Sequence, residues 1–330
     1  MKSEKPILIH FHFHKRKTGL TSSIENVLPY LERNFEIYIF GSLLSGKIIG
    51  WLEVLKLLQT RRKVIVHVHR NNEILRALFL RVIGSDFKLI ATRHAESTPS
   101  RLTLSLLKKA DAVISLTPKM QLSLPFSSTV VGHGVQTEFF RPDSSVKISN
   151  VIQENIICIA GRVRERKGHQ VVLDAVQPIL AKYPNWALVI VGKIDDQQFV
   201  ENLKGDISSN KLTSQVYFHP ETKNIKKYYQ ASKIVVVPSY SEGFSLVCLE
   251  AMSCGCTVVA TSGVGVHGDV IENQKTGYLF SPGDSEELRK VLFGLVSREL
   301  KYTSEAARDR IVNEWSAQRE ANQLKMLYLH

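Results

Sequence analysis

The stretch Val237-Pro-Ser-Tyr-Ser-Glu-Gly-Phe-Ser-Leu-Val-Cys-Leu-Glu-Ala-Met252 joins a β-branched run to an apolar segment of helical length through a short polar loop. The run Ile234–Val237 predicts a buried strand that ends at Pro238, and the apolar segment predicts a helix that begins near Phe244 or Ser245. Strand–loop–helix units of this kind build mainly parallel sheets, in which ligands bind at the carboxyl ends of the strands. The stretch therefore predicts an α/β fold with a ligand site in this loop.

The same alternation of strand and helix patterns extends along all 330 residues, a length suited to two domains. In the first half, strands are expected at Ile7–Phe13, Glu36–Phe40, Val64–His69, Lys88–Ala91, Ala112–Leu116 and Thr129–Val131. In the second half, they are expected at Ile156–Ala160, Ala187–Val191, Val216–Phe218, Ile234–Val237, Thr257–Ala260 and Tyr278–Phe280. We therefore predict two Rossmann-like domains that face each other across a cleft.

A polar connection between two strand patterns, at residues 141–155, marks the expected domain boundary. We assign residues 1–145 to an N-terminal domain and residues 146–314 to a C-terminal domain, which carries the predicted ligand loop. From Glu286 onward the pattern predicts helix to the end of the chain. The last part of this helix, about residues 315–330, is expected to pack back on the N-terminal domain.

The loop after the strand Ile234–Val237 carries Glu242 and Gly243, and the glycine allows a ligand to approach the backbone closely. Free N–H groups at the start of the next helix, together with the positive end of its dipole, make an anion site. Glu250 lies five residues past Ser245, about 7.5 Å along the helix axis, among apolar neighbours. Because an unpaired buried charge is costly, its carboxylate should meet either a hydrogen-bonding ligand or a cationic side chain.

A second motif, Cys158-Ile-Ala-Gly-Arg-Val-Arg-Glu-Arg-Lys-Gly168, follows another predicted strand of the second half. Arg162 and Lys167 lie on the loop that leads from this strand into the next helix. Two cations there can neutralise a pyrophosphate as it becomes a leaving group, without a metal ion. A basic loop alone is usually just solvated, but beside a predicted anion site it favours the binding of a diphosphate.

These two motifs resemble those of glycosyltransferase family 4, the retaining enzymes of the GT-B fold, over nearly the whole second half. The similarity rests on Gly161-Arg162, Lys167-Gly168, Pro238-Ser239 and Glu242-Gly243-Phe244, with Glu250 after seven further residues. The segments Ala251-Met252, Cys254-Gly255, Val258–Thr261, Thr276-Gly277 and Pro282-Gly283 also match the family's pattern. The resemblance implies a GT-B fold and a retaining hexosyltransferase that uses a GDP- or UDP-sugar.

By this resemblance, the two cations hold the donor diphosphate, the helix carboxylate holds the ribose, and the loop before the helix holds the transferred sugar. These groups are, in that order, Arg162 and Lys167; Glu250; and Glu242 with the backbone of Gly243, Phe244 and Ser245. Glu242 is also a catalytic candidate. Members of the family need no metal and no further cofactor, so neither is expected here.

The first half resembles the family less closely. His94 follows a predicted strand and stands where the family often places a histidine that supports the transferred sugar. It is the second catalytic candidate, and an ordinary packing or surface histidine is the alternative. The segment His133-Gly134-Val135 is similar to the family's segment before the linker.

The loop Thr18-Gly-Leu-Thr-Ser-Ser23 follows the first predicted strand and leads into a helix, a backbone site suited to a phosphate or a sugar. Gly19 is a donor-binding candidate there, and Thr21 is an acceptor-side candidate. Further acceptor-side candidates are Arg70, Asn71 and Glu73. Both segments resemble the branch of the family that adds mannose to the lipopolysaccharide core of Gram-negative bacteria. This resemblance implies mannose as the favoured sugar and a lipopolysaccharide core, another glycolipid or a saccharide as the acceptor.

Three histidines, His10, His12 and His14, alternate along the first predicted strand. They would share one face of that strand, which is a geometry that a metal ladder could use. Packing within a pleated sheet is the favoured interpretation, and no metal site is predicted.

The net charge of +12 is concentrated in the first half. Met1–Phe140 carries 11 Lys and 9 Arg against 10 Asp and Glu, a net charge of +10, and the remainder carries +2. Such an excess attracts polyanions, whether nucleic acid, an anionic membrane surface or an acidic glycolipid. The family resemblance implies an anionic glycolipid acceptor and contact with an anionic membrane, and no nucleic acid. A solvated basic face is the alternative.

The cellular location is predicted from what the sequence lacks. The four cysteines show no metal-site spacing, the first residues show no signal-peptide pattern, and no segment approaches about 20 apolar residues. We expect a cytoplasmic protein with peripheral contact at the inner face of the cytoplasmic membrane. Two alternatives to a transferase stay open: a non-catalytic protein that binds nucleotide-sugars or polyanions, and a related GT-B epimerase or phosphorylase.

Overall fold

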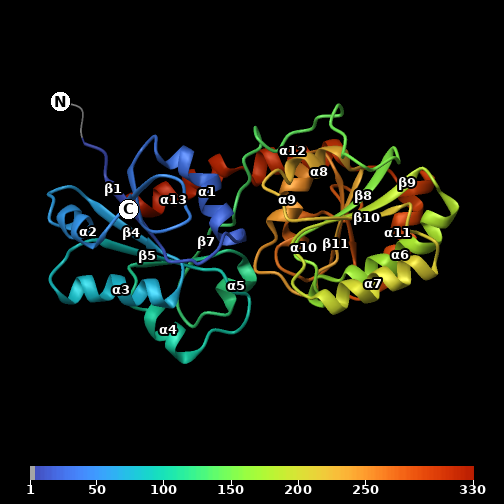
Figure 1. Cartoon of the computed structure of the whole chain (residues 1–330). Coiled ribbons are helices and arrows are strands. Elements are labelled where there is room, and N and C mark those ends of the chain that lie inside the picture. The colour runs from blue at the N-terminus through green and yellow to red at the C-terminus, as the bar shows by residue number, and fades with distance from the viewer. Residues whose placement is uncertain (1–3) are drawn as a thin grey trace. The chain divides into compact units, whose positions relative to one another are not determined.

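The computed structural model describes residues 4–330 and divides the chain into two compact units (Figure 1). Unit 1 comprises the chain up to Gln136 together with Trp315–His330, and unit 2 comprises Thr137–Glu314. The predicted boundary at residue 145 is therefore too late. The segment before it already packs into unit 2, where Ser253 Oγ donates to the carbonyl oxygen of Phe140 at 2.5 Å.

Unit 1 is built on a seven-stranded parallel sheet in the order β3-β2-β1-β4-β5-β6-β7. Its strands are β1 (Ile7–His12), β2 (Glu36–Gly41), β3 (Lys47–Ile49), β4 (Val64–Val68), β5 (Lys88–Arg93), β6 (Ala112–Ser115) and β7 (Thr129–Val130). Its helices are α1 (Gly19–Leu31), α2 (Trp51–Leu58), α3 (Asn71–Val82), α4 (Arg101–Leu107), α5 (Pro118–Leu122) and α13 (Ala317–Leu329). All six strands predicted for this half are present. The sequence missed β3, a three-residue edge strand too short to show an alternating pattern.

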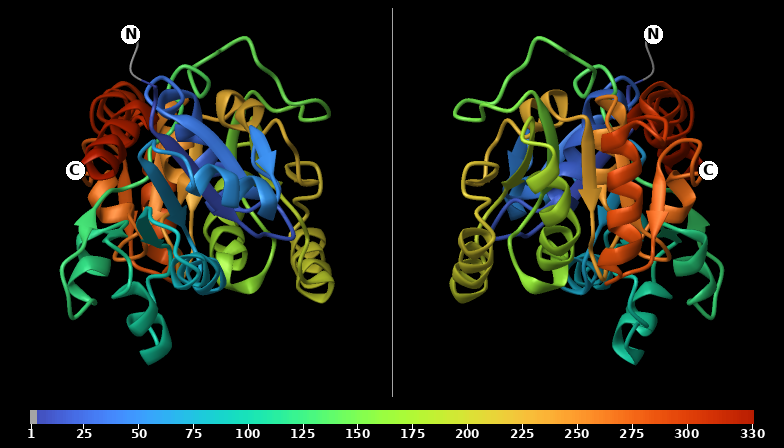
Figure 2. Two further views of the ribbon diagram at one scale, coloured as in Figure 1. Left: turned by 90° about the vertical axis from the view of Figure 1, so that its left-hand side faces the viewer. Right: turned by 90° about the vertical axis from the view of Figure 1, so that its right-hand side faces the viewer.

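The side chains of each unit 1 strand alternate between two cores. Ile7 and Ile9 face a core that they share with α2, α3 and α4. Leu8 and Ile65 face the opposite core, which is covered by α1 and α13. Figures 1 and 2 show α13, in red, beside the blue α1. The helix is held there by one apolar face, formed by Ala317, Ala321, Leu324 and Tyr328.

Unit 2 is built on a six-stranded parallel sheet in the order β10-β9-β8-β11-β12-β13. Its strands are β8 (Asn155–Ala160), β9 (Trp186–Val191), β10 (Val216–His219), β11 (Ile234–Val237), β12 (Thr257–Thr261) and β13 (Tyr278–Phe280), which confirms the six predicted ones. Its helices are α6 (His169–Lys182), α7 (Gln197–Ser209), α8 (Lys226–Ala231), α9 (Leu246–Ser253), α10 (His267–Val270), α11 (Ser285–Ser297) and α12 (Ser304–Glu314), with a 3-10 turn at Glu165–Lys167.

Both sheets reverse their strand order at one point, between β1 and β4 in unit 1 and between β8 and β11 in unit 2. Ligands of open parallel sheets bind at the carboxyl ends of the strands that flank such a switch point. In unit 2, the loops after β8 and β11 are the two that carry the predicted donor motifs.

The prediction of continuous helix from Glu286 to the end of the chain is wrong. Three helices, α11, α12 and α13, occupy this region. The first break follows α11, where Arg298 adopts a left-handed conformation with φ 67° and Leu300 folds back on Gly294. At the second break Ser316 caps α13, and the chain passes from unit 2 to unit 1. Within residues 4–330, each helix is too short or too polar to cross a membrane.

Candidate functional site

The loops after β8 and β11 meet at the switch point of unit 2. Nζ of Lys167 lies 2.5 Å from Oε1 of Glu242, and Ser239 Oγ donates to the same oxygen at 2.6 Å. Gly168 allows the two loops to approach: its φ is 71°, and a Cβ there would lie 2.2 Å from the carbonyl oxygen of Pro238. The two predicted motifs therefore form one cluster at the carboxyl ends of adjacent strands.

Arginines of the first loop make two further polar contacts. Nη1 of Arg162 lies 3.4 Å from Oδ2 of Asp195, and Nη2 of Arg166 donates to Ser241 Oγ at 2.8 Å. Exposed ion pairs contribute little to stability. The side chain of Arg162 is 27% exposed and that of Lys167 is 22% exposed, so an anionic ligand can reach both cations.

The helix α9 begins on a strained residue. Ser245, its N-cap, has φ 86° and ψ 71°, a region that residues with a Cβ rarely adopt. Its Oγ lies 3.0 Å from Nε2 of the buried His267, whose Nδ1 lies 2.9 Å from the carbonyl oxygen of Thr261. Because a carbonyl only accepts, the network assigns the proton of His267 to Nδ1, and the hydroxyl of Ser245 donates to Nε2. Gly243 and the buried Phe244 precede this cap.

Glu250 is buried on α9 without a cation. Its Oε2 accepts a hydrogen bond from Tyr229 Oη at 3.1 Å, and no ion pair to it occurs within residues 4–330. Burial raises the pKa of Glu250 from 4.5 to about 7, and the bond from Tyr229 opposes that shift. Of the two partners expected for this carboxylate, the structure offers no cation, which favours a hydrogen-bonding ligand.

The loop after β1 of unit 1 leads to two predicted site residues, Gly19 and Thr21. The space beside Gly19 is unfilled, whereas Thr21 is buried. Gly19 is the first residue of α1, and a Cβ there would meet nothing within 4 Å. Thr21 is fully buried. Its Oγ1 accepts from the backbone N–H of Thr18 at 3.2 Å and lies 3.4 Å from Nε2 of His12. The hydroxyl of Thr21 therefore helps to cap α1, and we no longer consider it an acceptor-side group.

The other acceptor-side candidates surround the start of α3. Arg70 is its exposed N-cap, and Nδ2 of Asn71 donates to a hydroxyl on α4 at 2.9 Å. Glu73 is fully buried: its carboxylate accepts from the backbone N–H of Phe13 at 3.0 Å and from that of His69 at 2.7 Å. Burial raises the pKa of Glu73, and these two bonds oppose the rise. Glu73 is thus a structural carboxylate that ties the ends of β1 and β4 together.

The second catalytic candidate, His94, belongs to a chain of histidines. Its Nε2 lies 3.1 Å from Nδ1 of His69, and its Nδ1 lies 3.4 Å from Nε2 of His133. Burial, followed by the neighbouring histidines, lowers the pKa of His94 well below its usual value. The ring is therefore neutral at physiological pH, with both nitrogens engaged inside unit 1.

The family model of group 1 glycosyl transferases matches residues 141–310, which is 170 of the 330 residues and includes both donor motifs. The chain belongs to this family of glycosyltransferases. The glycosyltransferase is 28% identical over 294 residues to the lipopolysaccharide core biosynthesis mannosyltransferase LpcC of Rhizobium leguminosarum bv. viciae. That similarity covers 85% of this chain and 83% of the Rhizobium protein.

Two solved structures resemble the glycosyltransferase, one over 56% of the chain and the other over 97% of it. The C-terminal domain of a glycosyl transferase group 1 family protein (LpcC) from Francisella tularensis is 30% identical, with a TM-score of 0.53 over 56% of this chain and 99% of that domain. Anabaena Alr3699/HepE, solved in complex with UDP, aligns with a TM-score of 0.80 over 97% of this chain and 99% of that one, at 18% identity. The predicted α/β class and GT-B fold are confirmed.

Three residues of the glycosyltransferase's candidate site were not found from sequence. Tyr229 lies on α8, and its contact with Glu250 depends on how α8 packs against α9. Asp195 follows β9 and reaches Arg162 only because β8 and β9 are neighbours. His267 follows β12, in a loop rich in glycine, and that position was its one sequence signal.

Proposed function

We propose that the chain transfers a hexose, with mannose favoured, from a nucleotide diphosphate-sugar to a lipopolysaccharide core or another glycolipid or saccharide acceptor, with retention at the anomeric carbon. The observation that carries this proposal is the junction of Lys167, Glu242 and Ser239 beside the start of α9. The similarity to a lipopolysaccharide core mannosyltransferase supports the choice of sugar and acceptor. The fold shared with a protein solved in complex with UDP supports a nucleotide-sugar donor.

A donor diphosphate at this junction would meet two cations and a helix N-terminus. Arg162 would exchange Asp195 for a phosphate oxygen, and Lys167 would do the same with Glu242, because charge-assisted bonds to phosphate are strong. Glu242 would then accept a hydrogen bond from a hydroxyl of the transferred sugar. Further along α9, the carboxylate of Glu250 would accept bonds from the two ribose hydroxyls.

The transfer step is a substitution on one face of the sugar. The bond between the anomeric carbon and the diphosphate oxygen breaks as the bond to the acceptor oxygen forms, and the proton of the acceptor hydroxyl passes to the leaving phosphate. Arg162 and Lys167 stabilise the charge that develops on this phosphate. With these two cations the step needs no metal ion. We assign Glu242 to holding the sugar, since its carboxylate is already engaged with Lys167 and Ser239.

A surface of unit 1 supports contact with the membrane that would carry a lipid-linked acceptor. Leu75, Phe79 and Val82 lie at i, i+4 and i+7 of α3 and are 51%, 57% and 83% exposed. Exposed cations, Arg101 and Lys108, belong to the neighbouring α4 and its C-cap. We propose that this apolar and basic face lies against an anionic membrane. The ring nitrogens of His94 are engaged, so we propose its backbone, together with the open backbone at Gly19, for contact with the sugars.

A nucleotide and donor screen tests the proposal. Purified protein is heated with GDP, UDP, ADP or CMP, and sugar transfer from GDP-mannose and UDP-glucose to lipopolysaccharide core oligosaccharide is measured. We expect thermal stabilisation by GDP or UDP, its loss in Glu250→Ala and Lys167→Ala, and a product with the anomeric configuration of the donor. No stabilisation by any nucleotide contradicts the donor site, and an inverted product contradicts the mechanism. Stabilisation without transfer supports the non-catalytic alternative.

A further inference from the structure

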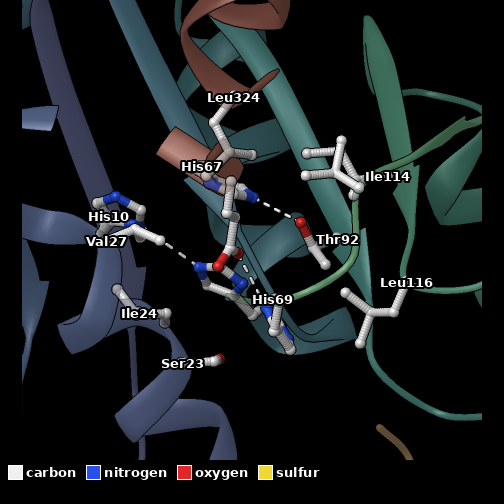
Figure 3. Close-up of a pocket in the computed structure, with 13 residues that line it drawn as sticks. His10, Ser23, Ile24, Val27, His67, His69, Thr92, Ile114, Leu116 and Leu324 are labelled. Atoms are coloured by element: carbon white, nitrogen blue, oxygen red, sulfur yellow. Dashed lines mark hydrogen bonds and ion pairs between the residues drawn. The ribbon is translucent and has the colours of Figure 1, made fainter. Parts of the chain in front are cut away.

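Three buried histidines from two neighbouring strands converge at the switch point of unit 1. β1 and β4 pair in parallel with His10 directly opposite His67, and His69 follows His67 by two residues on the same side of the strand. One nitrogen of each ring lies within 4.8 Å of a nitrogen of the other two. Figure 3 shows the three rings side by side, with dashed lines that join His67 to Thr92 and His69 to His10. The histidines that gather are thus not His10, His12 and His14, the ladder that was considered from the sequence and set aside in favour of sheet packing.

A carboxylate on α13 determines which nitrogen of His69 is free. His69, His94 and His133 form a row of hydrogen-bonded rings. At the end of this row, Nδ1 of His133 lies 3.0 Å from Oε1 of Glu320. As a carboxylate, Glu320 only accepts, so Nδ1 of His133 donates to it. Each histidine along the chain must then carry its proton on Nδ1 and accept on Nε2. Nε2 of His69 consequently turns a lone pair toward His10.

The protein's own groups leave His10 incompletely bonded. Its Nδ1 lies 3.5 Å from Nε2 of His69, at the limit of a hydrogen bond, and its Nε2 is buried without a partner among the described residues. A buried polar atom without a partner is destabilising. Burial favours the neutral form of all three imidazoles, and each neutral ring keeps one nitrogen lone pair.

A cavity of about 20 Å³ lies against these rings, which is enough space for one water molecule beside the ring nitrogens. Its other polar walls are His133, Ser23, Thr92 and Glu320. The remainder of its lining is apolar, so a bound group would be held by few and well-defined ligands.

We propose that His10, His67 and His69 bind a divalent transition-metal ion, with Zn²⁺ as the best fit. Neutral imidazoles are preferred zinc ligands and need to lose no proton on binding. Two nitrogens about 2.0 to 2.1 Å from a tetrahedral zinc ion are about 3.4 Å apart. Nδ1 of His10 lies 3.5 Å from Nε2 of His69, so this pair of atoms has the spacing of two zinc ligands. Water from the cavity would supply a fourth ligand.

The outer partners that such a site requires are already present. Nδ1 of His69 donates toward His94, which orients the ring as metal-ligating histidines usually are. The nitrogens of His67 lie 2.7 Å from Tyr328 Oη and 2.7 Å from Thr92 Oγ1. One of these hydroxyls would keep its bond to His67, and the other would lose its bond so that the freed nitrogen can coordinate the ion.

The ion would have a structural role. It would link β1 to β4 and, through the histidine chain, to α13, the helix that returns to unit 1 from the end of the sequence. Its three ligands are buried, so it would set the stability of unit 1 and the position of His94 without touching a substrate. It is independent of the transfer chemistry proposed for unit 2.

Metal analysis of the full-length protein tests the proposal. The protein is stripped with a chelator, equilibrated with Zn²⁺ or Co²⁺ and separated from free ions, and bound metal is measured by mass spectrometry and by the visible absorption of Co²⁺. We expect about one ion per chain, a tetrahedral Co²⁺ spectrum and a higher melting temperature. The variants His10→Gln and His69→Gln should lose affinity by about 100-fold or more. Glu320→Gln, which acts through the chain, should lose about 10- to 100-fold.

His12→Gln is the matched control. His12 is buried on the same strand, two residues past His10, and its Nδ1 bonds to the carbonyl oxygen of Ser42. This variant should bind metal as the original protein does. Fewer than about 0.1 ions per chain, or affinities for His10→Gln and His69→Gln equal to that of the control, would overturn the proposal. Circular dichroism shows whether His10→Gln and His69→Gln are folded. If one of them is not, the metal affinities of the other and of Glu320→Gln test the proposal.

Discussion

The two switch points of this molecule have the same strand order and opposite chemistry. In unit 2, the loops after β8 and β11 present Arg162, Lys167 and Glu242, whose charges are partly exposed and paired in ways that a ligand can replace. In unit 1, the ends of β1 and β4 present buried imidazoles and a buried carboxylate, Glu73, whose bonds are to other groups of the same unit. The strand order therefore determines where the loops meet. The side chains at that place determine whether it binds a ligand or stabilises the fold.

The contrast is sharpest for two buried glutamates. Burial raises the pKa of both Glu250 and Glu73. Glu73 accepts bonds from the backbone N–H groups of Phe13 and His69, whereas Glu250 accepts one bond, from Tyr229. The first is a completed structural group, and the second has spare acceptor capacity for a ligand. Substitutions at four positions test the contrast between the two switch points, from the largest expected effect to the smallest.

Lys167→Met should have the largest effect, on transfer. The substitution removes a cation from the proposed diphosphate site, and we expect kcat/KM to fall by about 10²- to 10³-fold, as for the loss of one preorganised charge stabiliser. The exposed Lys204→Met on α7 is the control and should leave the rate unchanged. Steady-state kinetics measure kcat/KM for both variants. A fall in kcat/KM of less than about threefold for Lys167→Met would contradict the assignment of Lys167 to the diphosphate site.

Glu250→Gln should stabilise the protein while weakening donor binding. The folded-state pKa of about 7 lies above the ordinary value of 4.5, so the buried charge destabilises the fold increasingly as pH rises from 4.5 to 7, and fully above pH 7. Removing that charge should raise the free energy of unfolding by about 3 kcal/mol at pH 8 and by little at pH 4.5. Urea denaturation at the two pH values measures the difference. Equal effects at both would disprove this account.

The same glutamate predicts how donor affinity depends on pH. Ribose hydroxyls that donate to Glu250 favour its charged form, so donor binding should release a proton near pH 7. Donor affinity of the original protein should therefore fall as pH drops below 7, by up to about tenfold per unit. Glu250→Gln should bind weakly at every pH, as calorimetry can establish.

Glu73→Gln should act in the opposite direction on stability. The amide can satisfy only one of the two backbone N–H groups, so the other loses its acceptor, at a cost of about 1 to 3 kcal/mol. The exposed Glu32→Gln in unit 1 is the control. Urea denaturation at neutral pH should show a loss for Glu73→Gln and none for Glu32→Gln. A stabilised Glu73→Gln would remove the distinction between the two glutamates.

Ser245→Gly should have the smallest effect. Glycine adopts the positive φ of this cap without strain, which should stabilise the fold by about 1 kcal/mol. It also removes the hydroxyl that donates to His267, which should destabilise the fold by about the same amount. The net change should stay within about 1 kcal/mol. Ser245→Ala loses the hydrogen bond and keeps the strain, so it should be less stable than Ser245→Gly by about 1 kcal/mol. Equal stability of these two variants would show that the cap stores no strain.

Much of the candidate site could be predicted from local sequence. Each donor motif is a continuous strand–loop–helix segment, so a β-branched run and a glycine are enough to place Lys167 and Glu242 at strand ends. The contact between them, like that between Tyr229 and Glu250, joins residues from separate elements. Thr21 and Glu73 were misjudged for the same reason, because their partners lie on the backbone of other segments or inside the helix cap.

The sequence by itself determined the strands, the α/β class and the two donor loops, because these depend on patterns within a few contiguous residues. The packing of the last helix on the first domain was expected, but only the tertiary structure decided which core α13 covers and that His10 meets His67 and His69. Those outcomes depend on strand order, on register and on which apolar face the last helix covers. Each of these is set by contacts between residues far apart in the chain, whose pairing leaves no local pattern.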